Sequence, residues 1–321
     1  MDLIFMNENK EDLGVLLDYE MDLAFGKDEN NFECRIQSGT HCCNAGFYLY
    51  MEGTEYGGII DGIKSDTELG EVTYQGRTWH GLLNSKVIEP ASGSAYLVLS
   101  GEANAVIASI LEALSLSDLF EASSASSGLT VSNYKMNRYI AGYDGIKKML
   151  NTVGAKLNFS FEDGKVILSA VPKHDYTQDE EFDSDQIAFR VKKNYKTVNH
   201  LVCLGSGELT NRMVVHLFAD ASGNISRTQT QFGMDEYAAV YDYSAVESEE
   251  ELISSGTEKL KSLWGQDELS VDLDDTSDTY GLGDIVGAYD NITKISAAAE
   301  ITKKIVTIKN GQITISYEVG E

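Results

Sequence analysis

The sequence predicts a mainly β protein with an α+β middle. Apolar and polar residues alternate strictly over Gln312–Val319 near the C-terminus, and shorter segments alternate in the part of the chain before Pro90. Between these ends the apolar residues adopt helical spacing over Glu102–Leu116 and Asp144–Val153. We therefore expect two small antiparallel β-barrel-like domains that flank an α/β unit, with a strand–helix insertion in the second barrel.

Residues 1–95 form the first predicted domain, a small antiparallel sheet curled into a barrel. Gly, Asp and Asn gather between its apolar segments and supply the turns. The predicted strands are Asp18–Phe25, Phe32–Gln37, Phe47–Met51, Tyr56–Ile63 and Val72–Tyr74. A helically spaced segment around Trp79 closes the domain and runs to Pro90.

Residues 96–180 form the predicted middle domain of two helices and a hairpin. Ser100 or Gly101 is expected to cap the first helix. The second helix ends at Gly154, a residue that tolerates the left-handed conformation found after helices. Two alternating strands follow, joined by an Asp163-Gly164 turn.

Residues 181–321 form the third predicted domain, a second barrel with a helix-containing insertion at about 217–268. The helix begins at a capping box, Ser248 with Glu251 three residues later. At the C-terminal end, Asn310-Gly311 favours a type I′ hairpin turn. Three strands are predicted here, Asp284–Tyr289, Lys303–Lys309 and Gln312–Val319, and we call them the C-terminal meander. A meander of this size does not bury its apolar face alone. The expected partner strands lie upstream, at Ile187–Val191, Leu201–Leu204 and Met213–Ala219.

The net charge of the chain restricts the classes of partner that it can bind. The 321 residues carry 51 acidic and 25 basic side chains, a formal net charge of −26 that repels nucleic-acid phosphates and anionic lipid headgroups. No apolar run approaches the ~20 residues that cross a bilayer, and the N-terminus lacks the pattern of a signal peptide. The four cysteines do not form a secreted disulfide framework, so we expect synthesis in a reducing compartment.

Two clusters contain metal-ligating residue types. In His41-Cys42-Cys43 the ligand spacing of a zinc site is missing, and the other histidines and Cys203 are scattered, so packed strand residues are expected. The acidic stretch before the meander lacks the Gly and Glu of an EF-hand, because Thr279 and Ile285 stand in their places. A solvated acidic loop is expected for its members, Asp272, Asp274, Asp275, Asp278 and Asp284.

Catalytic motifs are weaker still. Asp179-Glu180-Glu181 lies in a connector and Glu249-Glu250-Glu251 at a helix N-terminus, so structural roles are expected for both carboxylate runs rather than glycoside hydrolysis. Gly205-Ser206-Gly207 is not a nucleophile elbow, because Leu204 and Glu208 occupy the outer glycine positions. We assign no catalytic, cofactor-binding or metal residues, and we expect a protein that is not an enzyme and needs no cofactor.

The order of the elements resembles the baseplate hub, or distal tail hub, proteins of siphophage-type phages and prophages. Three patterns carry the resemblance, and family members often have Arg where this chain has Lys86. The first pattern is Val72, Tyr74, Gly76, Leu82, Leu83, Ile88 and Pro90. The second is Ile146, Leu150, Gly154, Phe159, Phe161, Asp163 and Gly164. The third is Tyr280, Leu282, Gly283, Asp284, Ile285 and Val286, then Ile305, Gly311, Ile315, Tyr317 and Val319.

The resemblance implies a homotrimeric ring whose six barrels surround the tail channel. It also implies contacts with the distal tail, tape measure and tail tip or fibre proteins, a place in the virion tail, and synthesis in the bacterial cytoplasm. If DNA passes through such a ring, we expect some of the excess acid to line the channel, with Asp272, Asp274 and Glu318 as candidates. Specific binding of nucleic acid and of membranes is not expected.

Two alternatives remain at this stage. A cell-wall-degrading tail enzyme would need a further domain, and this chain is expected to leave no room for one after its last strand, at Glu321. A carbohydrate-binding β module would present clustered exposed aromatic residues. The tyrosines in the clear strands instead alternate into the apolar face, as Tyr19, Tyr74 and Tyr317 do.

Overall fold

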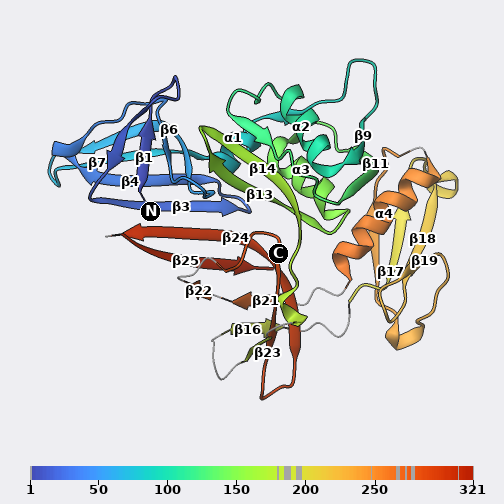
Figure 1. Ribbon diagram of the computed structural model, residues 1–321. Coiled ribbons are helices and arrows are strands. Elements are labelled where there is room, and N and C mark those ends of the chain that lie inside the picture. Colours follow the sequence, from blue (N-terminus) through green and yellow to red (C-terminus); the bar gives the residue numbers. More distant parts are fainter. Residues whose placement is uncertain are drawn as a thin grey trace. The chain divides into compact units, whose positions relative to one another are not determined.

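In a computed structural model of the chain, more residues lie in strands than in helices (Figure 1). The predicted class, mainly β with a mixed α/β part, is confirmed. The described residues are 2–178, 181–183, 189–192, 197–246, 248–264, 268–271, 273–275, 279–309 and 311–320. They form two compact units: residues 1–189 with 270–289 and 298–321, and residues 190–269 with 290–297.

One large sheet joins the two ends of the chain. Its main path runs β15–β23–β24–β3–β4–β7–β6–β5–β1–β2, and β25 and β22 continue from β24. The strands of the path are β15 (Glu181–Asp183), β23 (Ile285–Tyr289), β24 (Ser296–Lys309), β3 (Tyr19–Gly26), β4 (Asn31–Gln37), β7 (Glu71–Thr78), β6 (Gly57–Asp66), β5 (Tyr48–Tyr50), β1 (Leu3–Met6) and β2 (Asp12–Leu16). The continuation consists of β25 (Gln312–Val319) and β22 (Leu273–Asp275).

The partner of the C-terminal meander is β3, from the N-terminal part of the chain. Figure 1 shows β24 beside β3, and the register places Lys304 opposite Phe25 and Val306 opposite Leu23. The prediction that Leu201–Leu204 and Met213–Ala219 would pair with the meander is therefore wrong. Those segments pair with each other in a separate sheet, because alternation specifies which face of a strand is buried but not which strand lies next to it.

The closing hairpin forms as predicted, with Lys309 paired to Gln312. Gly311 has a φ of +74°, in the left-handed region, while Asn310 lies outside the described residues. We expect Gly311→Val to lower the free energy of unfolding by about 1–3 kcal/mol, because a β-branched residue is strained at positive φ. Thermal melting measures this cost. Gly311→Asn is the matched control, since Asn tolerates this region, and equal melting temperatures for the two variants would contradict the assigned turn.

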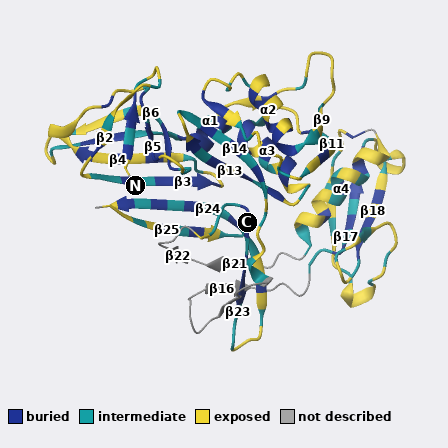
Figure 2. Ribbon diagram, viewed as in Figure 1, coloured by how far each residue is buried: buried dark blue, intermediate teal, exposed yellow. Residues whose placement is uncertain are grey.

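The middle of the chain builds two helices against a small sheet. β14 lies between β13, its antiparallel neighbour, and β10, its parallel neighbour, and β9 pairs with β11. In β13 and β14 buried residues alternate with more exposed ones, whereas most residues of β9 and β11 are intermediate or exposed (Figure 2). The elements are α1 (Trp79–Asn84), β8 (Val87–Ile88), β9 (Leu97–Glu102), α2 (Ala103–Ala113), β10 (Phe120–Ala122), β11 (Thr130–Met136), β12 (Ile140–Ala141), α3 (Gly142–Asn151), β13 (Ala155–Glu162) and β14 (Lys165–Pro172).

Two of the predicted local features in this part are confirmed and one is wrong. Gly154 follows α3 with a φ of +68°, and Asp163 and Gly164 both have positive φ in the β13–β14 turn. The cap of α2 is neither Ser100 nor Gly101. Glu102 is the N-cap residue, and its side chain accepts a hydrogen bond from the backbone N–H of the third residue after it. Glu102 therefore occupies the N-cap position, where Ser or Asp is more common than Glu.

The core does not stop at residue 95. Tyr50 and Trp79, from the first predicted domain, pack in one cluster with Ile107, Leu150 and Phe161 of the middle part. The rings of Trp79 and Phe161 are stacked with centroids 5.5 Å apart. The division into domains at residues 95 and 180 stays a prediction.

The second unit is a four-stranded sheet covered on one face by a helix. The strand order is β19–β18–β17–β20, and α4 packs Leu252 and Leu260 onto Cys203 and Leu217. The predicted capping box is confirmed in part, because the Ser248 hydroxyl accepts a hydrogen bond from the Glu251 N–H. The elements are β17 (His200–Leu204), β18 (Val214–Ala219), β19 (Ile225–Ser226), β20 (Ala238–Asp242) and α4 (Glu249–Leu263).

A short pair of strands, β16 (Phe189–Lys192) and β21 (Glu268–Val271), completes the described sheets. Within the part of the chain that the structure describes, no helix combines the length and the apolar character needed to cross a membrane.

Candidate functional site

The large sheet has one apolar face and one charged face. Along β3 the residues Met21, Leu23 and Phe25 are buried, while Glu20 and Asp22 alternate with them and point to the other side. The neighbouring strands keep the same alternation, because paired residues of a sheet share a face. The outer face of β24, β3, β4 and β7 is therefore a row of charged and polar side chains.

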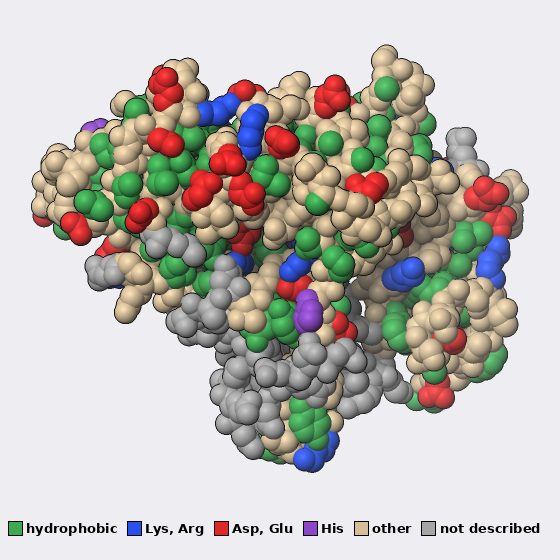
Figure 3. All heavy atoms as spheres, in the orientation of Figure 1, with side chains coloured by type: hydrophobic (Ala, Val, Ile, Leu, Met, Phe, Trp, Pro, Cys, Tyr) green, Lys and Arg blue, Asp and Glu red, His purple; other side chains and the backbone are tan. Residues whose placement is uncertain are grey.

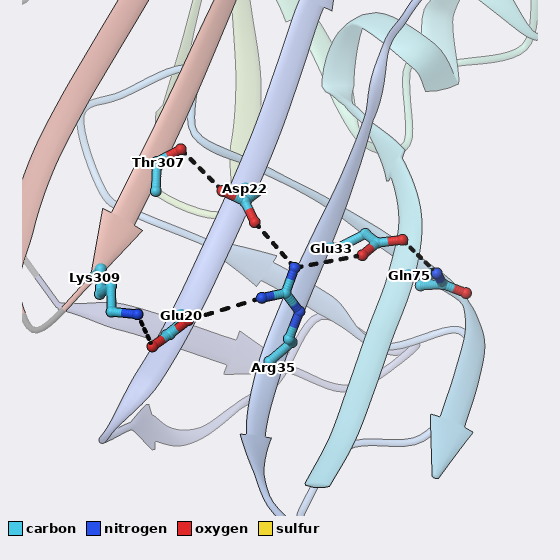
Figure 4. A network of polar contacts seen from close by, with 7 residues as sticks. All are labelled: Glu20, Asp22, Glu33, Arg35, Gln75, Thr307 and Lys309. Atoms are coloured by element: carbon cyan, nitrogen blue, oxygen red, sulfur yellow. Dashed lines mark hydrogen bonds and ion pairs between the residues drawn. The ribbon is translucent and has the colours of Figure 1, made fainter. Parts of the chain in front are cut away.

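Arg35 lies at the centre of this charged face (Figure 4). Its guanidinium is 3.5 Å from the Asp22 carboxylate, 3.8 Å from that of Glu20 and 4.0 Å from that of Glu33. Lys309, on β24, adds a second cation 2.6 Å from Glu20. All of these side chains are 40–58% exposed, so each ion pair is screened by water and contributes little to stability by itself.

Two neutral side chains extend the network across the strands (Figure 4). The Thr307 hydroxyl donates to Asp22 at 2.9 Å, and the Gln75 amide donates to Glu33 at 2.5 Å. The network therefore crosses from β24 through β3 and β4 to β7. It orients the acidic side chains of β3 and β4 through contacts that come from four adjacent strands, of which β24 lies far from the others in sequence.

A hollow of about 740 Å³ lies beside the network. Its charged lining consists of Asp22, Glu29, Glu33, Asp61 and Arg77. Arg77 binds Asp61 through two guanidinium hydrogen bonds of 2.8 and 2.7 Å, and these bonds are the largest cause that lowers the pKa of the Asp61 carboxyl. Because the lining holds four carboxylates and one guanidinium, the hollow carries an excess of negative charge.

A second group of charges is buried on the opposite face of the sheet. Lys304, on β24, is only 2% exposed, and its ammonium lies 2.7 Å from the Glu55 carboxylate. The other oxygen of Glu55 lies 3.5 Å from Nε2 of His80 on α1. The Lys304 ammonium also sits 5.2 Å from the centre of the Tyr56 ring. This cluster joins the last strands of the chain to a loop and a helix of its first hundred residues.

Aromatic rings enclose His80. Its ring centroid is 3.8 Å from that of Phe159, 4.9 Å from Phe25 and 5.2 Å from Tyr143. Nδ1 of His80 is buried and has no hydrogen-bond partner among the described residues. Burial in this apolar cage lowers the pKa of His80 to about 4, although Glu55 acts in the opposite direction.

Glu55 remains ionised in the same cluster. Burial by itself raises the pKa of its carboxyl, but the nearby positive charge and hydrogen bond of Lys304, together with the smaller influence of its other neighbours, outweigh this effect, so the net shift is downward. The cluster at neutral pH is therefore a Lys–Glu ion pair beside a neutral imidazole.

A further buried ion pair ties the middle part to the C-terminal meander. Lys156, on β13, lies 2.6 Å from Asp284, which is 2% exposed and also accepts hydrogen bonds from the backbone N–H groups of Gly281 and His174. The prediction of a solvated acidic loop is wrong for Asp284, because an ammonium and two amides hold its carboxylate inside the fold. Of the other members, Asp272 and Asp278 lie outside the described residues, and nothing is described of the side chains of Asp274 and Asp275.

The His41-Cys42-Cys43 cluster is in a loop after the 3-10 turn η1 (Ser38–Thr40), not in a strand as predicted. The Tyr74 hydroxyl organises this loop: it lies 2.9 Å from Nδ1 of His41 and accepts hydrogen bonds from the backbone N–H groups of both cysteines. Cys42 is exposed and Cys43 is buried, with burial raising the pKa of the Cys43 thiol. Among the residues that the structure describes, no group of three or more His, Cys, Asp or Glu side chains is placed to hold a metal ion.

The structure does not bring the acidic runs together in a described site. Asp179 and Glu180 lie outside the described residues. The run at 249–251 occupies the first turn of α4, where Glu249 pairs with Arg227 at 2.6 Å. Gly205 and Ser206 pair through their backbones with Met213, as an extension of the β17–β18 ladder. The structural roles expected for the second run and for this segment are in keeping with these contacts.

No family model matches the sequence, and a search of curated proteins gave no match. The fold has counterparts among solved structures. A tail protein from Neisseria meningitidis MC58 superposes with a TM-score of 0.53 at 12% identity, over 100% of this chain and 96% of that one. The 43 kDa tail protein of prophage MuSo2 from Shewanella oneidensis gives 0.59 at 10% identity, over 100% and 98%. The prophage tail protein gp18 from Listeria monocytogenes EGD-e gives 0.53 at 11%, over 99% and 94%.

The chain has the fold of these tail proteins. The likeness covers both ends of the chain and the middle, so it includes the segments that form the large sheet. The sequence patterns that suggested a tail hub protein are thus consistent with the observed fold. Identities of 10–12% carry the likeness of fold and not the roles of single residues.

Sequence reasoning missed the buried cluster of Lys304, Glu55 and His80 on the large sheet. Lys304 occupies an inward position of β24, two residues before Val306, and a charged residue in that alternation is the observation that would have indicated it. Glu55 carries no comparable pattern, since it lies in a turn between two strands. His80 was treated as one of several scattered histidines.

Proposed function

We propose that this chain is a structural subunit of a phage or prophage tail, and that three copies form a hub ring around the DNA channel at the distal end or baseplate. The observation that carries the proposal is the likeness of fold to three tail proteins over nearly the full length of both chains. The proposed subunit is not an enzyme. Its role is structural: it forms part of the ring and contacts the neighbouring tail proteins. It is made in the cytoplasm of the bacterial host and ends in the virion tail.

The architecture of the sheet supports a wall-like role. Its apolar face packs against the helices and hairpin of the middle part, and its opposite face carries the charged network around Arg35. A sheet that is dry on one side and charged on the other is suited to separate a protein interior from a water-filled space. The pairing of β24 with β3 makes the sheet continuous, because it joins strands from the two ends of the chain.

The proposed partners follow from the position in the tail. They are two further copies of this chain in the ring, the distal tail and tape measure proteins, and the tail tip or fibre proteins. Figure 3 shows that Asp and Glu side chains outnumber Lys and Arg side chains on the face in view, in keeping with the net charge of −26. Such a surface favours protein partners with basic contact regions over nucleic acid or anionic membranes.

We further propose that acidic side chains line the channel and leave passing DNA mobile. Glu318, on β25, is 56% exposed and is a candidate, as are the carboxylates of the charged face. We expect no measurable affinity for duplex DNA at physiological salt. A merely solubilising charge would give the same result, so the deciding observation is the charge map of an assembled ring. A neutral or basic inner wall would refute the acidic channel.

Light scattering at high protein concentration tests the oligomer. The expected mass is three times the 35.2 kDa of one chain, because a ring subunit covers part of its surface only when it is assembled. A stable dimer with a large two-fold interface would contradict the ring.

A further inference from the structure

The sheet of the second unit has one face that no described element of that unit covers. On the other face, α4 buries Leu201, Cys203, Val215 and Leu217. The alternate residues of the same strands point away from α4. They form a three-by-three array whose rows follow from the strand register: Phe218, His200 and Ala238; His216, Val202 and Val240; and Val214, Leu204 and Asp242.

The array is mostly apolar. Two of its rows are partly or fully exposed, whereas Phe218 in the first row is buried. Val240 is 67% exposed and Val214 45%. Apolar side chains that share one face and are exposed together mark an interaction surface, whereas singly scattered ones do not.

Polar groups at the two ends of the array are fixed by hydrogen bonds. At one end, the Glu236 carboxylate lies 2.5 Å from Nδ1 of His200, and Nε2 of His200 lies 2.8 Å from Nδ1 of His216. His216 is exposed, so this hydrogen-bonded chain reaches the solvent-facing side of the array.

The rim of the array is acidic. Asp235 is exposed in the turn η4 (Gly233–Asp235), next to Glu236, and Asp242 is exposed at the far end of β20. One cation in contact with this rim is Arg212, which lies 2.6 Å from Asp242. Three carboxylates and one guanidinium thus border an apolar centre.

We infer that this open sheet face docks an amphipathic helix of a partner protein, with an apolar stripe flanked by Lys or Arg. The size of the occupant is indicated by α4, a 15-residue helix that lies along β17 and β18 on the opposite face of the same sheet (Figure 1). The flanking charge is indicated by the rim, because its carboxylates complement cationic donors. A second copy of this chain in face-to-face contact would instead oppose acid to acid.

A peptide-display selection with the full-length chain as bait tests whether an amphipathic helix binds this face. The displayed peptides have about the same length as α4, which is 15 residues long. The library fixes helix-forming residues and varies the apolar spacing and the flanking charge. We expect enriched peptides with apolar residues at helical spacing and an excess of Lys and Arg. No enrichment, or enrichment of acidic peptides or of peptides without helical spacing, would overturn the inference.

Point variants locate the bound peptide. Val240→Lys should weaken the selected peptide at least about tenfold, because it places an ammonium in the apolar centre. Ile292→Lys is the matched control, since Ile292 is 89% exposed in the same unit but is not part of the array, and it should leave binding unchanged. Equal binding to both variants would overturn the inference, as would light scattering that shows self-association lost only in Val240→Lys. Neither result bears on the hub ring, which is measured separately by the mass of the assembly.

Discussion

Replacing Lys304 with Met is expected to lower the free energy of unfolding by about 3–5 kcal/mol, because it leaves the Glu55 carboxylate, whose side chain is only 20% exposed, without its ammonium partner. The two groups are 2.7 Å apart, and Lys304 is 2% exposed on the core face of β24. The loss should appear in urea unfolding as a lower midpoint with an unchanged slope. It should also loosen the joint between the two ends of the chain, since β24 pairs with β3.

The same strand offers a matched control. Lys309→Met removes a lysine that also pairs with a glutamate, Glu20, but both of these side chains are at least 40% exposed. Its cost should stay below about 1 kcal/mol. The double variant Lys304→Met with Glu55→Leu should recover most of the lost stability, because no unpaired charge remains buried. Equal losses for Lys304→Met and Lys309→Met would contradict the account of the buried cluster.

Acid is expected to destabilise the protein through His80. The imidazole has a usual pKa of 6.5 and a pKa of about 4 in the fold, so between these values the unfolded chain binds a proton that the folded chain does not. The contribution of a neutral His80 to the free energy of unfolding is therefore fully present above pH 6.5, and it is lost as the pH is lowered toward 4. The loss from this group should reach about 3 kcal/mol, at 1.36 kcal/mol per pKa unit. The lowered pKa of Glu55 acts in the same direction at still lower pH.

His80→Gln isolates this contribution. Glutamine keeps a hydrogen-bond donor near Glu55 but does not titrate. Urea unfolding of both proteins at a series of pH values should show a smaller loss of stability in the variant between pH 6.5 and 4. Parallel curves for the two proteins would mean that His80 is already protonated in the fold or is not buried there.

The local structure was largely predictable from the sequence, and the long-range pairing was not. Gln312–Val319 forms the strand that its alternation predicted, and the α4 helix begins at its Ser248 capping residue. These features depend on neighbouring residues alone. The choice of β3 as partner of β24 depends on packing between segments that are almost the whole chain apart, and many half-buried strands would satisfy the same alternation.

The candidate site illustrates the same limit. A single alternation predicts that Glu20 and Asp22 face water, but only the register across the strands shows that Arg35 lies among their carboxylates. The tail-protein fold itself recurs at 10–12% identity. That is physically reasonable, because a fold needs its pattern of buried positions and many residue choices fill them.

Cryo-electron microscopy of tail particles that contain this chain is the most direct test of the central claim. The account predicts density for three copies around the tail axis at the distal end, arranged as a ring with the DNA channel at its centre. Tails from which the chain is deleted should lack this ring. Density elsewhere in the tail, a two-fold arrangement, or complete tails in the absence of the chain would contradict the proposed hub.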